Sequence, residues 1–456
     1  MDVHARPLDQ VTPTLEQRCE SWDNYCNLFG VILHGNVNMQ LPNLWLWEMI
    51  DEFIYQFQSF CQYRGKLSVK TKEELALLKE CDQVWNVVGV INYLQALVDK
   101  SNIIAVLDRE RQGLEKFSET EGYDYNQSNV LRTMGYFSLI GLHRIHVLLG
   151  NYTQSLKVLD PIDLDKPGIF TKVPGARVST AYHVGFAYFM SKRYTDAIRH
   201  FNSALVYVNR HKVGATRPYA LDLLLKKQEQ MYALAAMCVT LAGGGGGSSN
   251  AQSTVMRLLE EGIMSSLREK HGDDMSRMGQ GVQSAFDELF SYSCPKFVTP
   301  TAPAEAAAAA GEGGGGINYN EEAYRSQLKL FLAEVASYEK LPVLRSFLKL
   351  YTSISVAKLA DLMEVEADVL RQQLTCMKEK SQCVEWRGGA SALDGVPVSI
   401  SDVDFTVEND MIHVTDVTPP KRNGEYFLRH IAKQNTLMED LAPAKPLVFK
   451  GNLTAA

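Results

Sequence analysis

Two stretches of the chain repeat one pattern 42 residues apart, and both read as helical. They are "LLGNYTQSLKVLDPI" (148–162) and "FMSKRYTDAIRHFNSAL" (189–205). Sequence repeats of this length are typical of helical hairpins that stack into solenoids, as in tetratricopeptide-like arrays. The pattern predicts a mainly α, helical-repeat (TPR-like) solenoid; a plain helical hairpin in a non-repetitive bundle is the alternative. The aligned pairs are Tyr152 and Tyr194, Leu156 and Ile198, and Leu159 and Phe201.

Small residues lie where the two helices of the second copy should meet. Gly185 shares a face with Tyr182 and Phe189 on the first helix, and Ala197 lies on the apolar face of the next. Small side chains let two helix backbones approach closely. We therefore expect tight packing at this point.

Helical periodicity also dominates the region before the repeat. In "LPNLWLWEMIDEFIYQFQSFCQYR" (41–64), apolar residues recur at steps of three and four after a proline, which suits a helix start. The segment 73–100 shows the same period, so we expect a helix there too. The predicted core stripe of the first helix is Leu46, Ile50, Phe53, Phe57 and Phe60.

Composition limits the classes of function. The 456 residues are 46% hydrophobic and carry a formal charge of −7, so the chain as a whole does not attract nucleic acid. The eight cysteines form no Cys-x-x-Cys, which argues against structural zinc. No signal peptide and no apolar run of about 18 residues are present, so we expect a cytoplasmic protein without a membrane segment.

In the C-terminal third of the chain, short helical patterns are followed by strand patterns. This order predicts a winged helix over 343–418. Helical patterns at 343–351, 356–363 and 366–380 are followed by a short strand at 383–386 and a hairpin at 404–415. The third helix is expected to face inward with Val369, Leu370, Leu374 and Met377.

Asn409-Asp410 is the expected two-residue turn of that hairpin. This register pairs Val407 with Ile412 and Phe405 with Val414 on an apolar face. The opposite face then carries the candidate partner-binding residues of the winged-helix edge, where an added strand could dock. These residues are Thr406, Glu408, Met411 and His413.

A last helix at 424–441 carries an apolar stripe although the winged helix before it is complete. Such a stripe needs a partner, because large exposed apolar patches are uncommon on soluble monomers. Either another chain supplies the partner, or the helix folds back on its own solenoid. The stripe residues are Phe427, Ile431, Met438 and Leu441.

Basic residues are too sparse to predict strong nucleic-acid binding. The helix expected at 366–380 is the third helix of the predicted winged helix. Its positive charges are balanced by acidic residues, which disfavours binding to a nucleic-acid duplex. The candidate RNA or ribosome contacts are Lys421, Arg422, Arg429 and Lys433.

Features that could indicate catalysis or a cofactor are incomplete. The runs 243–249 and 302–316 lack the Lys and Ser or Thr of a phosphate loop, so we expect flexible surface inserts. His143 and His146 lie at metal-ligand spacing on one helix, but no acidic residue is near them in that stretch to complete a site. We predict no catalytic site, no metal site and no cofactor, and a G-x-S-x-G elbow is absent.

A helical solenoid capped by a winged helix resembles the PCI-domain family, named after the proteasome lid, the COP9 signalosome and translation initiation factor three. Long blocks in the same order make the resemblance closest to the L-subunit family of eukaryotic translation initiation factor three, over residues 41–441. Besides the 41–64 block, they are "LGNYTQSLKVLDPIDL" (149–164), "YHVGFAYFMSKRYTDAIRHF" (182–201), "ELFSYSCPKF" (288–297), "SFLKLYTSISVAKLA" (346–360), "SALDG" (391–395) and "DMIHV" (410–414).

The resemblance implies a non-catalytic scaffold subunit that supports assembly of the preinitiation complex on the small ribosomal subunit and messenger RNA. It implies the K subunit and neighbouring PCI subunits as partners, with the terminal helix joining a bundle shared between subunits. A PCI subunit of the proteasome lid or signalosome, or a direct RNA-binding module, is the alternative.

The expected division has four parts. They are an N-terminal segment (1–40), N-terminal helical repeats (41–204), a PCI domain (205–420), and a C-terminal helix with a tail (421–456).

Overall fold

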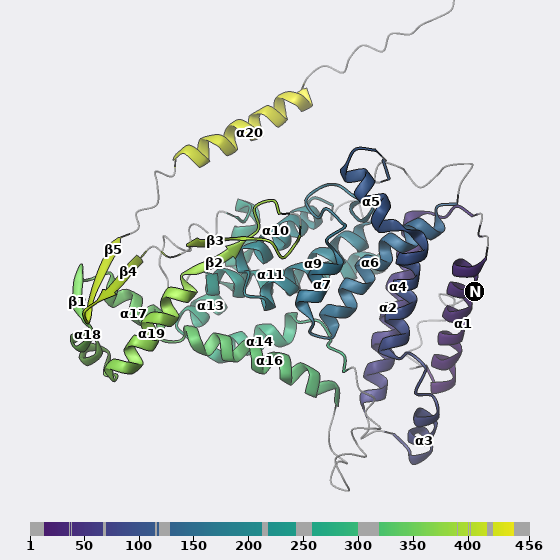
Figure 1. The fold of residues 1–456 in the computed structure, drawn as a ribbon, viewed down its shortest axis with the longest axis horizontal. Coiled ribbons are helices and arrows are strands. Elements are labelled where there is room, and N and C mark those ends of the chain that lie inside the picture. Colours follow the sequence, from purple (N-terminus) through teal and green to yellow (C-terminus); the bar gives the residue numbers. More distant parts are fainter. Residues whose placement is uncertain are drawn as a thin grey trace, which may run out of the picture.

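The computed structural model describes most of the chain, and its helices other than the last pack into one elongated body with a small sheet at one end (Figure 1). The described residues are 13–35, 37, 39–66, 70–114, 116–117, 128–211, 218–242, 258–299, 319–389, 391–399, 401, 403–416 and 423–441. Both predicted inserts, 243–249 and 302–316, lie outside them.

The mainly helical fold predicted from the periodicity is confirmed. Before the repeat lie α1 (Leu15–His34), α2 (Asn43–Gly65), α3 (Lys72–Glu80), α4 (Val87–Ser101) and α5 (Ile103–Arg111). The solenoid continues with α6 (Val130–Leu148), α7 (Tyr152–Val158), α8 (Ile169–Lys172), α9 (Pro174–Met190), α10 (Tyr194–His211), α11 (Pro218–Ala242), α13 (Glu261–Gly279), α14 (Gln283–Ser293) and α16 (Tyr319–Tyr338). Packing runs from α4 and α2 onto α6, and then through α9, α10 and α11 to α14 and α16.

The 42-residue repeat is visible in the backbone as well as in the sequence. Gly150 and Lys192, which are 42 residues apart, both have left-handed φ values, +78° and +63°. The same hydrogen bond closes each turn: Asn151 N–H donates to the His146 carbonyl, and Arg193 N–H donates to the Tyr188 carbonyl. The two hairpins, α6–α7 and α9–α10, are therefore copies of one unit.

The close approach predicted at Gly185 is also confirmed. A Cβ atom added to Gly185 would lie 2.3 Å from Cε1 of Phe201, which is buried on α10. The helices α9 and α10 can pack at this separation only because residue 185 has no side chain.

The N-terminal helices are held by aromatic side chains. All five residues of the stripe predicted on α2 are buried. The single helix expected over 73–100 is wrong, since α3 ends at Glu80 and α4 begins at Val87. Trp85 in the break has φ +50° and packs between Trp22 and Phe53, while its Nε1–H donates to the Arg18 carbonyl. The free energy gained by burying the Trp85 indole is therefore larger than the local preference for one continuous helix.

The winged helix is confirmed, with strands that sequence reasoning missed. Its elements are α17 (Leu341–Leu348), β1 (Ser353–Ser355), α18 (Val356–Met363), α19 (Ala367–Lys380), β4 (Val403–Glu408) and β5 (Met411–Asp416). The strands form an antiparallel sheet in the order β1-β5-β4. A separate hairpin of β2 (Gln382–Glu385) and β3 (Val396–Ser399) lies between α19 and β4.

The predicted hairpin register is confirmed in full. Val407 pairs with Ile412 and Phe405 with Val414, and the turn residues Asn409 and Asp410 have φ +50° and +61°. Positive φ at both positions gives the turn type that matches strand twist.

Two side chains do not face inward as expected. Val369 is 39% exposed, because the face of α19 that meets the core carries Leu370, Leu374 and Met377 instead. Val407 is 45% exposed and lies near the turn at the end of the hairpin.

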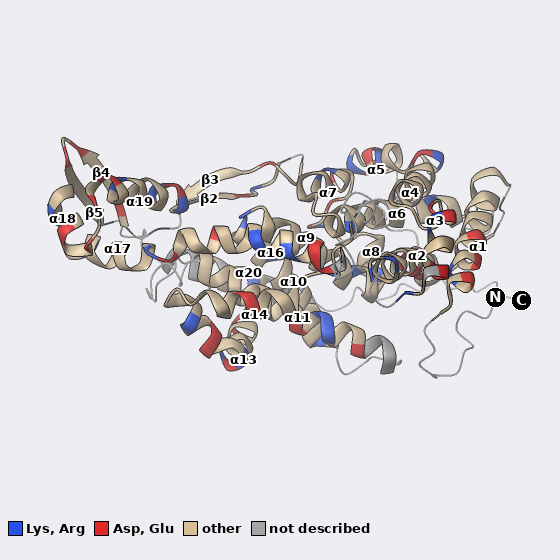
Figure 2. Ribbon diagram, turned by 90° about the horizontal axis from the view of Figure 1, so that it is seen from below, with Lys and Arg blue, Asp and Glu red and all other residues tan. Residues whose placement is uncertain are grey.

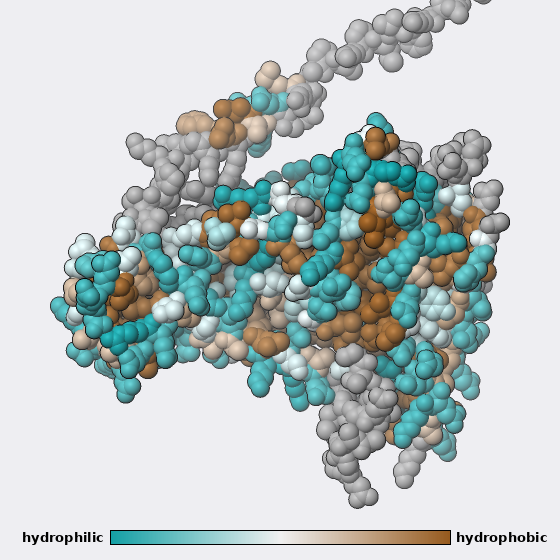
Figure 3. Space-filling model, viewed as in Figure 1, coloured by the Kyte–Doolittle hydropathy of each residue, from teal (hydrophilic) through white to brown (hydrophobic). Residues whose placement is uncertain are grey.

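The helix α20 (Asn423–Leu441) stands away from the solenoid (Figure 1). Its side chains form an apolar surface, which Figure 3 shows as a brown patch. Phe427 is 60% exposed, and Ile431 and Met438 are exposed as well. Within the described residues, no helix combines the length and apolar character needed to cross a membrane.

The substitution Gly185→Ala should lower the free energy of unfolding by about 1–3 kcal/mol, because the new methyl group overpacks the Phe201 contact. Thermal unfolding followed by circular dichroism measures the effect. Gly30→Ala is the matched control, since Gly30 lies within α1 and a Cβ there meets nothing within 4 Å. The control should stabilise slightly, by about 0.5–1 kcal/mol. Equal effects of the two substitutions would contradict this packing.

Candidate functional site

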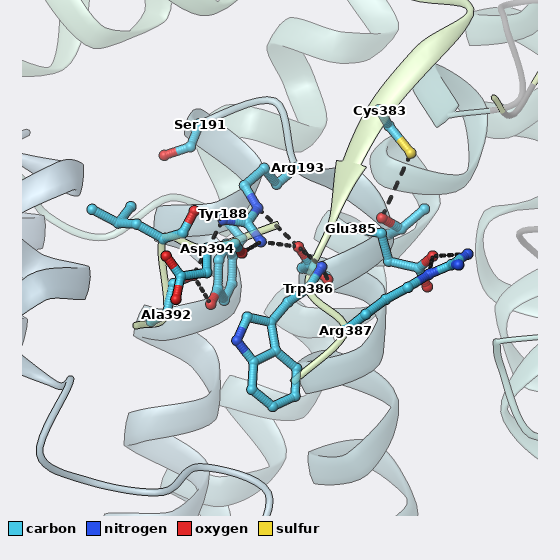
Figure 4. A network of polar contacts seen from close by, with 12 residues as sticks. Tyr188, Ser191, Arg193, Cys383, Glu385, Trp386, Arg387, Ala392 and Asp394 are labelled. Carbon is cyan, nitrogen blue, oxygen red and sulfur yellow. Dashed lines mark hydrogen bonds and ion pairs between the residues drawn. The ribbon is translucent and has the colours of Figure 1, made fainter. Parts of the chain in front are cut away.

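The loop between β2 and β3 joins the winged-helix end of the chain to the solenoid. This β2–β3 loop comprises residues 386–395, of which 390 lies outside the described residues. It packs against the turn between α9 and α10, the second copy of the repeat (Figure 4). Ala392 and Leu393 of the loop pack against the hydrophobic core, and a network of polar contacts surrounds them.

Arg193 is the centre of this joint. Its Nη1 donates to the carbonyls of Ala392 at 3.2 Å and Leu393 at 2.9 Å, and its Nη2 donates to the carbonyl of Asp394 at 2.9 Å. The guanidinium also lies over the Tyr188 ring, 4.9 Å from its centroid. One side chain from the solenoid therefore binds three successive carbonyl groups of the loop.

Asp196, three residues after Arg193 and on α10, is the acidic partner of Arg193. Arg193 Nε donates to its carboxylate at 2.8 Å, and the carboxylate also accepts the Trp386 backbone N–H at 3.0 Å. The side chains of Arg193 and Asp196 are 8% and 2% exposed. Removing one partner of such a buried pair leaves the other charge unpaired, which is costly.

Further hydrogen bonds fix both sides of the loop. On one side, Asp160 accepts from the Ser391 hydroxyl at 2.8 Å and from the Ala392 N–H at 3.0 Å. On the other, Arg199 donates to the Trp386 carbonyl and to the Glu385 carboxylate, both at 3.1 Å.

A second buried charge links the same turn to the winged helix. Glu334 on α16 accepts from Lys192 in the α9–α10 turn and from Lys380 at the end of α19. Burial alone would raise the pKa of Glu334, but the hydrogen bonds from the two lysines hold that pKa below its ordinary value. Charge-assisted bonds of this kind are stronger than neutral ones.

These contacts position two bodies relative to each other. The acceptors are carbonyls and carboxylates that already have donors, and the donors are a guanidinium and lysines that already have acceptors. The arrangement fixes the orientation of the β2–β3 hairpin, and with it the end of α19, against the solenoid.

The structure brings together the four residues predicted at the winged-helix edge. Thr406 lies opposite His413 and Glu408 opposite Met411, and all four are exposed on the same face. The expected strand position of two of them is wrong. Met411 and His413 lie on β5, which is the central strand because β1 pairs with it, so the outer strand next to them is β4.

The other predicted contact residues are placed only in part. Lys433 is exposed on α20, which also contains Arg429 and Leu441, whose side chains are not described. Lys421 and Arg422 lie outside the described residues.

The two histidines at metal-ligand spacing, which were not expected to bind a metal, lie on α6, with His143 buried and His146 half-buried. His143 is fully buried, and its Nδ1 is 3.0 Å from the Ser155 carbonyl. Burial lowers the pKa of His143 to about 4, so the ring is neutral at pH 7. Among the described residues, no three His, Cys, Asp or Glu side chains are grouped to hold a metal ion.

Sequence reasoning used "SALDG" only as part of a resemblance and did not single out Arg193. The acceptors of Arg193 are backbone carbonyls, which leave no mark in a sequence. The acidic Asp196 three residues later was the available signal, because that spacing pairs charges on one helix face.

Replacing Arg193 by Met should destabilise the chain by about 2–4 kcal/mol, because buried Asp196 loses its closest cation and keeps only Arg199, at 3.9 Å. The loop should also become sensitive to limited proteolysis. Thermal unfolding and mass mapping of early cleavage products measure both effects.

The control is Arg387→Met in the same loop. Arg387 pairs with Glu385 and is 58% exposed, so its loss should cost less than about 1 kcal/mol. If both variants unfold like the parent and resist cleavage equally, Arg193 does not hold the joint.

The chain matches one family model and several known proteins over most of its length. Residues 17–434 match the family model described as RNA polymerase I-associated factor PAF67. Over 432 residues, the chain is 44% identical to "Eukaryotic translation initiation factor 3 subunit L" of Xenopus tropicalis and of Homo sapiens, covering 94% of this chain and 73% of each relative. The protein of the same name from Danio rerio is 43% identical, with 71% of its length covered.

The resemblance drawn from the sequence is thereby confirmed at the level of the family. Because the family model and these relatives each span most of the chain, the chain belongs to the family of eukaryotic translation initiation factor 3 subunit L.

Proposed function

We propose that the chain is a non-catalytic scaffold subunit of the eukaryotic translation initiation factor 3 complex, acting in the cytoplasm. In this role it supports assembly of the preinitiation complex on the small ribosomal subunit and messenger RNA. The observation that carries the proposal is the family membership. A solenoid joined through buried charge to a winged helix supports it, because such a body holds separate docking surfaces at fixed positions.

The relatives' name favours this complex over the proteasome lid or the signalosome. A direct RNA-binding role for the winged helix is disfavoured by its charges. On α19, Arg371 pairs with Asp368 and Asp410, Lys378 pairs with Asp404, and Lys380 pairs with Glu334. Basic and acidic residues are also interspersed along the ribbon (Figure 2).

Affinity purification of the tagged chain with mass spectrometry tests the proposal. Co-isolation of the other initiation factor 3 subunits is the expected result. Recovery of proteasome-lid or signalosome subunits in their place would contradict it.

The proposed division of the chain follows the same family. Residues 205–420 form the PCI domain in this proposal, preceded by repeats at 41–204 and followed by the terminal helix. The K subunit and neighbouring PCI subunits are the proposed partners. The exposed winged-helix face and the outer edge of β4 next to the hairpin turn are the proposed contact, since edge strands can pair with an added strand. Further from the turn, side chains of Ser401, Asp404 and Lys378 already bond the backbone groups of Val403 and Phe405.

Replacing both Met411 and His413 by Asp should weaken binding to the K subunit without unfolding the chain, because both side chains are exposed. Co-purification of the two subunits measures it, with circular dichroism as the check on folding. The matched control replaces Gln382 and Val384, exposed residues two apart on β2, by Asp. If the winged-helix variant retains the K subunit as the control does, this surface is not the contact.

The exposed stripe on α20 is proposed to enter a helical bundle shared with other subunits, with knobs-into-holes packing. Truncation after Asn423 should remove the subunit from the complex and leave the stability of the isolated chain nearly unchanged. Co-purification and thermal unfolding measure the two effects. A destabilised isolated chain would instead show that α20 folds back on its own solenoid.

A further inference from the structure

Two cations lie over one aromatic ring where α1, α2 and α3 meet. The guanidinium carbon of Arg18 on α1 is 4.7 Å from the centroid of the Tyr63 ring on α2. The Nζ of Lys70, two residues before α3, is 3.1 Å from the same centroid. The separation of the two cations cannot exceed the sum of these distances. Like charges held this close repel each other unless an anion compensates them.

The carboxylate beside this ring is already engaged. Glu74 on α3 accepts the Tyr63 hydroxyl at 2.8 Å and the backbone N–H of Thr71 at 3.3 Å. These two hydrogen bonds, the Tyr63 bond first, hold the pKa of Glu74 below its ordinary value. The charge of Glu74 therefore serves the start of α3 and the Tyr63 hydroxyl.

Both cations keep donors for a further acceptor. Arg18 donates from Nε to the Pro13 carbonyl at 3.3 Å and from Nη1 to the Ser59 hydroxyl at 3.1 Å, and Nη2 remains. Within the part of the chain that the structure describes, Lys70 makes no hydrogen bond and no ion pair. A guanidinium and an ammonium this close can donate to neighbouring carboxylates of one segment.

Side chains suited to a protein partner lie close to the two cations. Tyr55 is 58% exposed and lies one turn before Ser59 on α2. Leu77 is 49% exposed and lies one turn after Glu74 on α3. Tyrosine and arginine are enriched among the residues that carry the binding energy of protein interfaces. The surface thus offers an aromatic and an aliphatic contact beside its positive charges.

Acidic residues on the same helices favour a short acidic segment over a nucleic acid. Glu16 and Glu20 on α1 and Glu73 on α3 are exposed. Their charges repel a continuous phosphate backbone, which carries a negative charge at every nucleotide. A peptide can place its carboxylates at the two cations alone.

We propose that Arg18 and Lys70 form a docking site for an acidic segment of another protein. Carboxylates of the segment bind the two cations, and its apolar side chains contact Tyr55 and Leu77. Because the charges are partly exposed, the affinity should fall as salt is raised. The inference does not depend on which complex contains the chain.

Fluorescence anisotropy with the full chain tests the site. The probe is a fluorescein-labelled peptide of alternating glutamate and leucine, and the reference is a lysine–leucine peptide of the same length. The glutamate peptide should bind saturably, and the lysine peptide should not. Lys70→Gln should weaken binding about fivefold, as expected for the loss of one partly exposed ion pair.

The matched control is Lys79→Gln. Lys79 is an exposed lysine near the other end of α3, so its loss should leave the affinity unchanged. Circular dichroism should show that both variants are folded, since Lys70 makes no hydrogen bond that the fold would lose.

A second measurement uses the parent chain, so it does not depend on a variant. A carbodiimide should couple the glutamates of the peptide to Lys70 several-fold more often than to Lys79, because docking holds carboxylates at the Lys70 ammonium. Peptide mass mapping measures the two yields.

The docking site is refuted if the glutamate peptide does not bind, or if it binds the parent and Lys70→Gln equally. Equal coupling to Lys70 and Lys79 also refutes it. A uridine oligonucleotide that binds more tightly than the peptide, with the same dependence on Lys70, would assign the surface to nucleic acid and overturn the proposal.

Discussion

The guanidinium of Arg193 carries the connection between the solenoid and the β2–β3 hairpin. It is buried, it pairs with a buried carboxylate, and it donates to three successive carbonyl groups. A buried ion pair gains little net stability unless its remaining donors are satisfied. Here they are satisfied by a loop distant in sequence, so the loop and the pair depend on each other.

This dependence explains how a repeat fold carries a rigid appendage. In a stacked array each unit contacts mainly its neighbours, so a domain at the end is free to swing unless specific bonds hold it. Arg193 lies in the turn of the second repeat copy. Its backbone N–H makes the hydrogen bond that closes this turn, and the equivalent hydrogen bond closes the turn of the first copy. The adjacent Lys192 reaches Glu334, which also binds Lys380. A single turn thus anchors both the β2–β3 loop and α19.

Much of the fold could be predicted from local sequence pattern. The contact between the β2–β3 loop and the solenoid could not. The bounds of α18 were predicted to the residue, and the hairpin turn at Asn409-Asp410 was predicted from chemistry that favours positive φ. The break at Trp85 was missed, because burial of an indole by distant aromatic rings overrides helical periodicity. The strand β1 was missed because three residues between helices carry too little pattern, and its pairing with β5 placed Met411 and His413 on a central strand. The contacts of Arg193 with the β2–β3 loop were not predicted, because their acceptors are backbone carbonyls.

The central claim is that the β2–β3 loop is held to the solenoid in the native chain, and amide hydrogen exchange tests it directly. The N–H groups of Trp386 and Ala392 belong to a loop, yet they donate to the carboxylates of Asp196 and Asp160. Both should exchange as slowly as the amides of β2, with protection that is lost only on unfolding of the surrounding solenoid. Exchange at the rate of an exposed loop would show that the joint is open in solution.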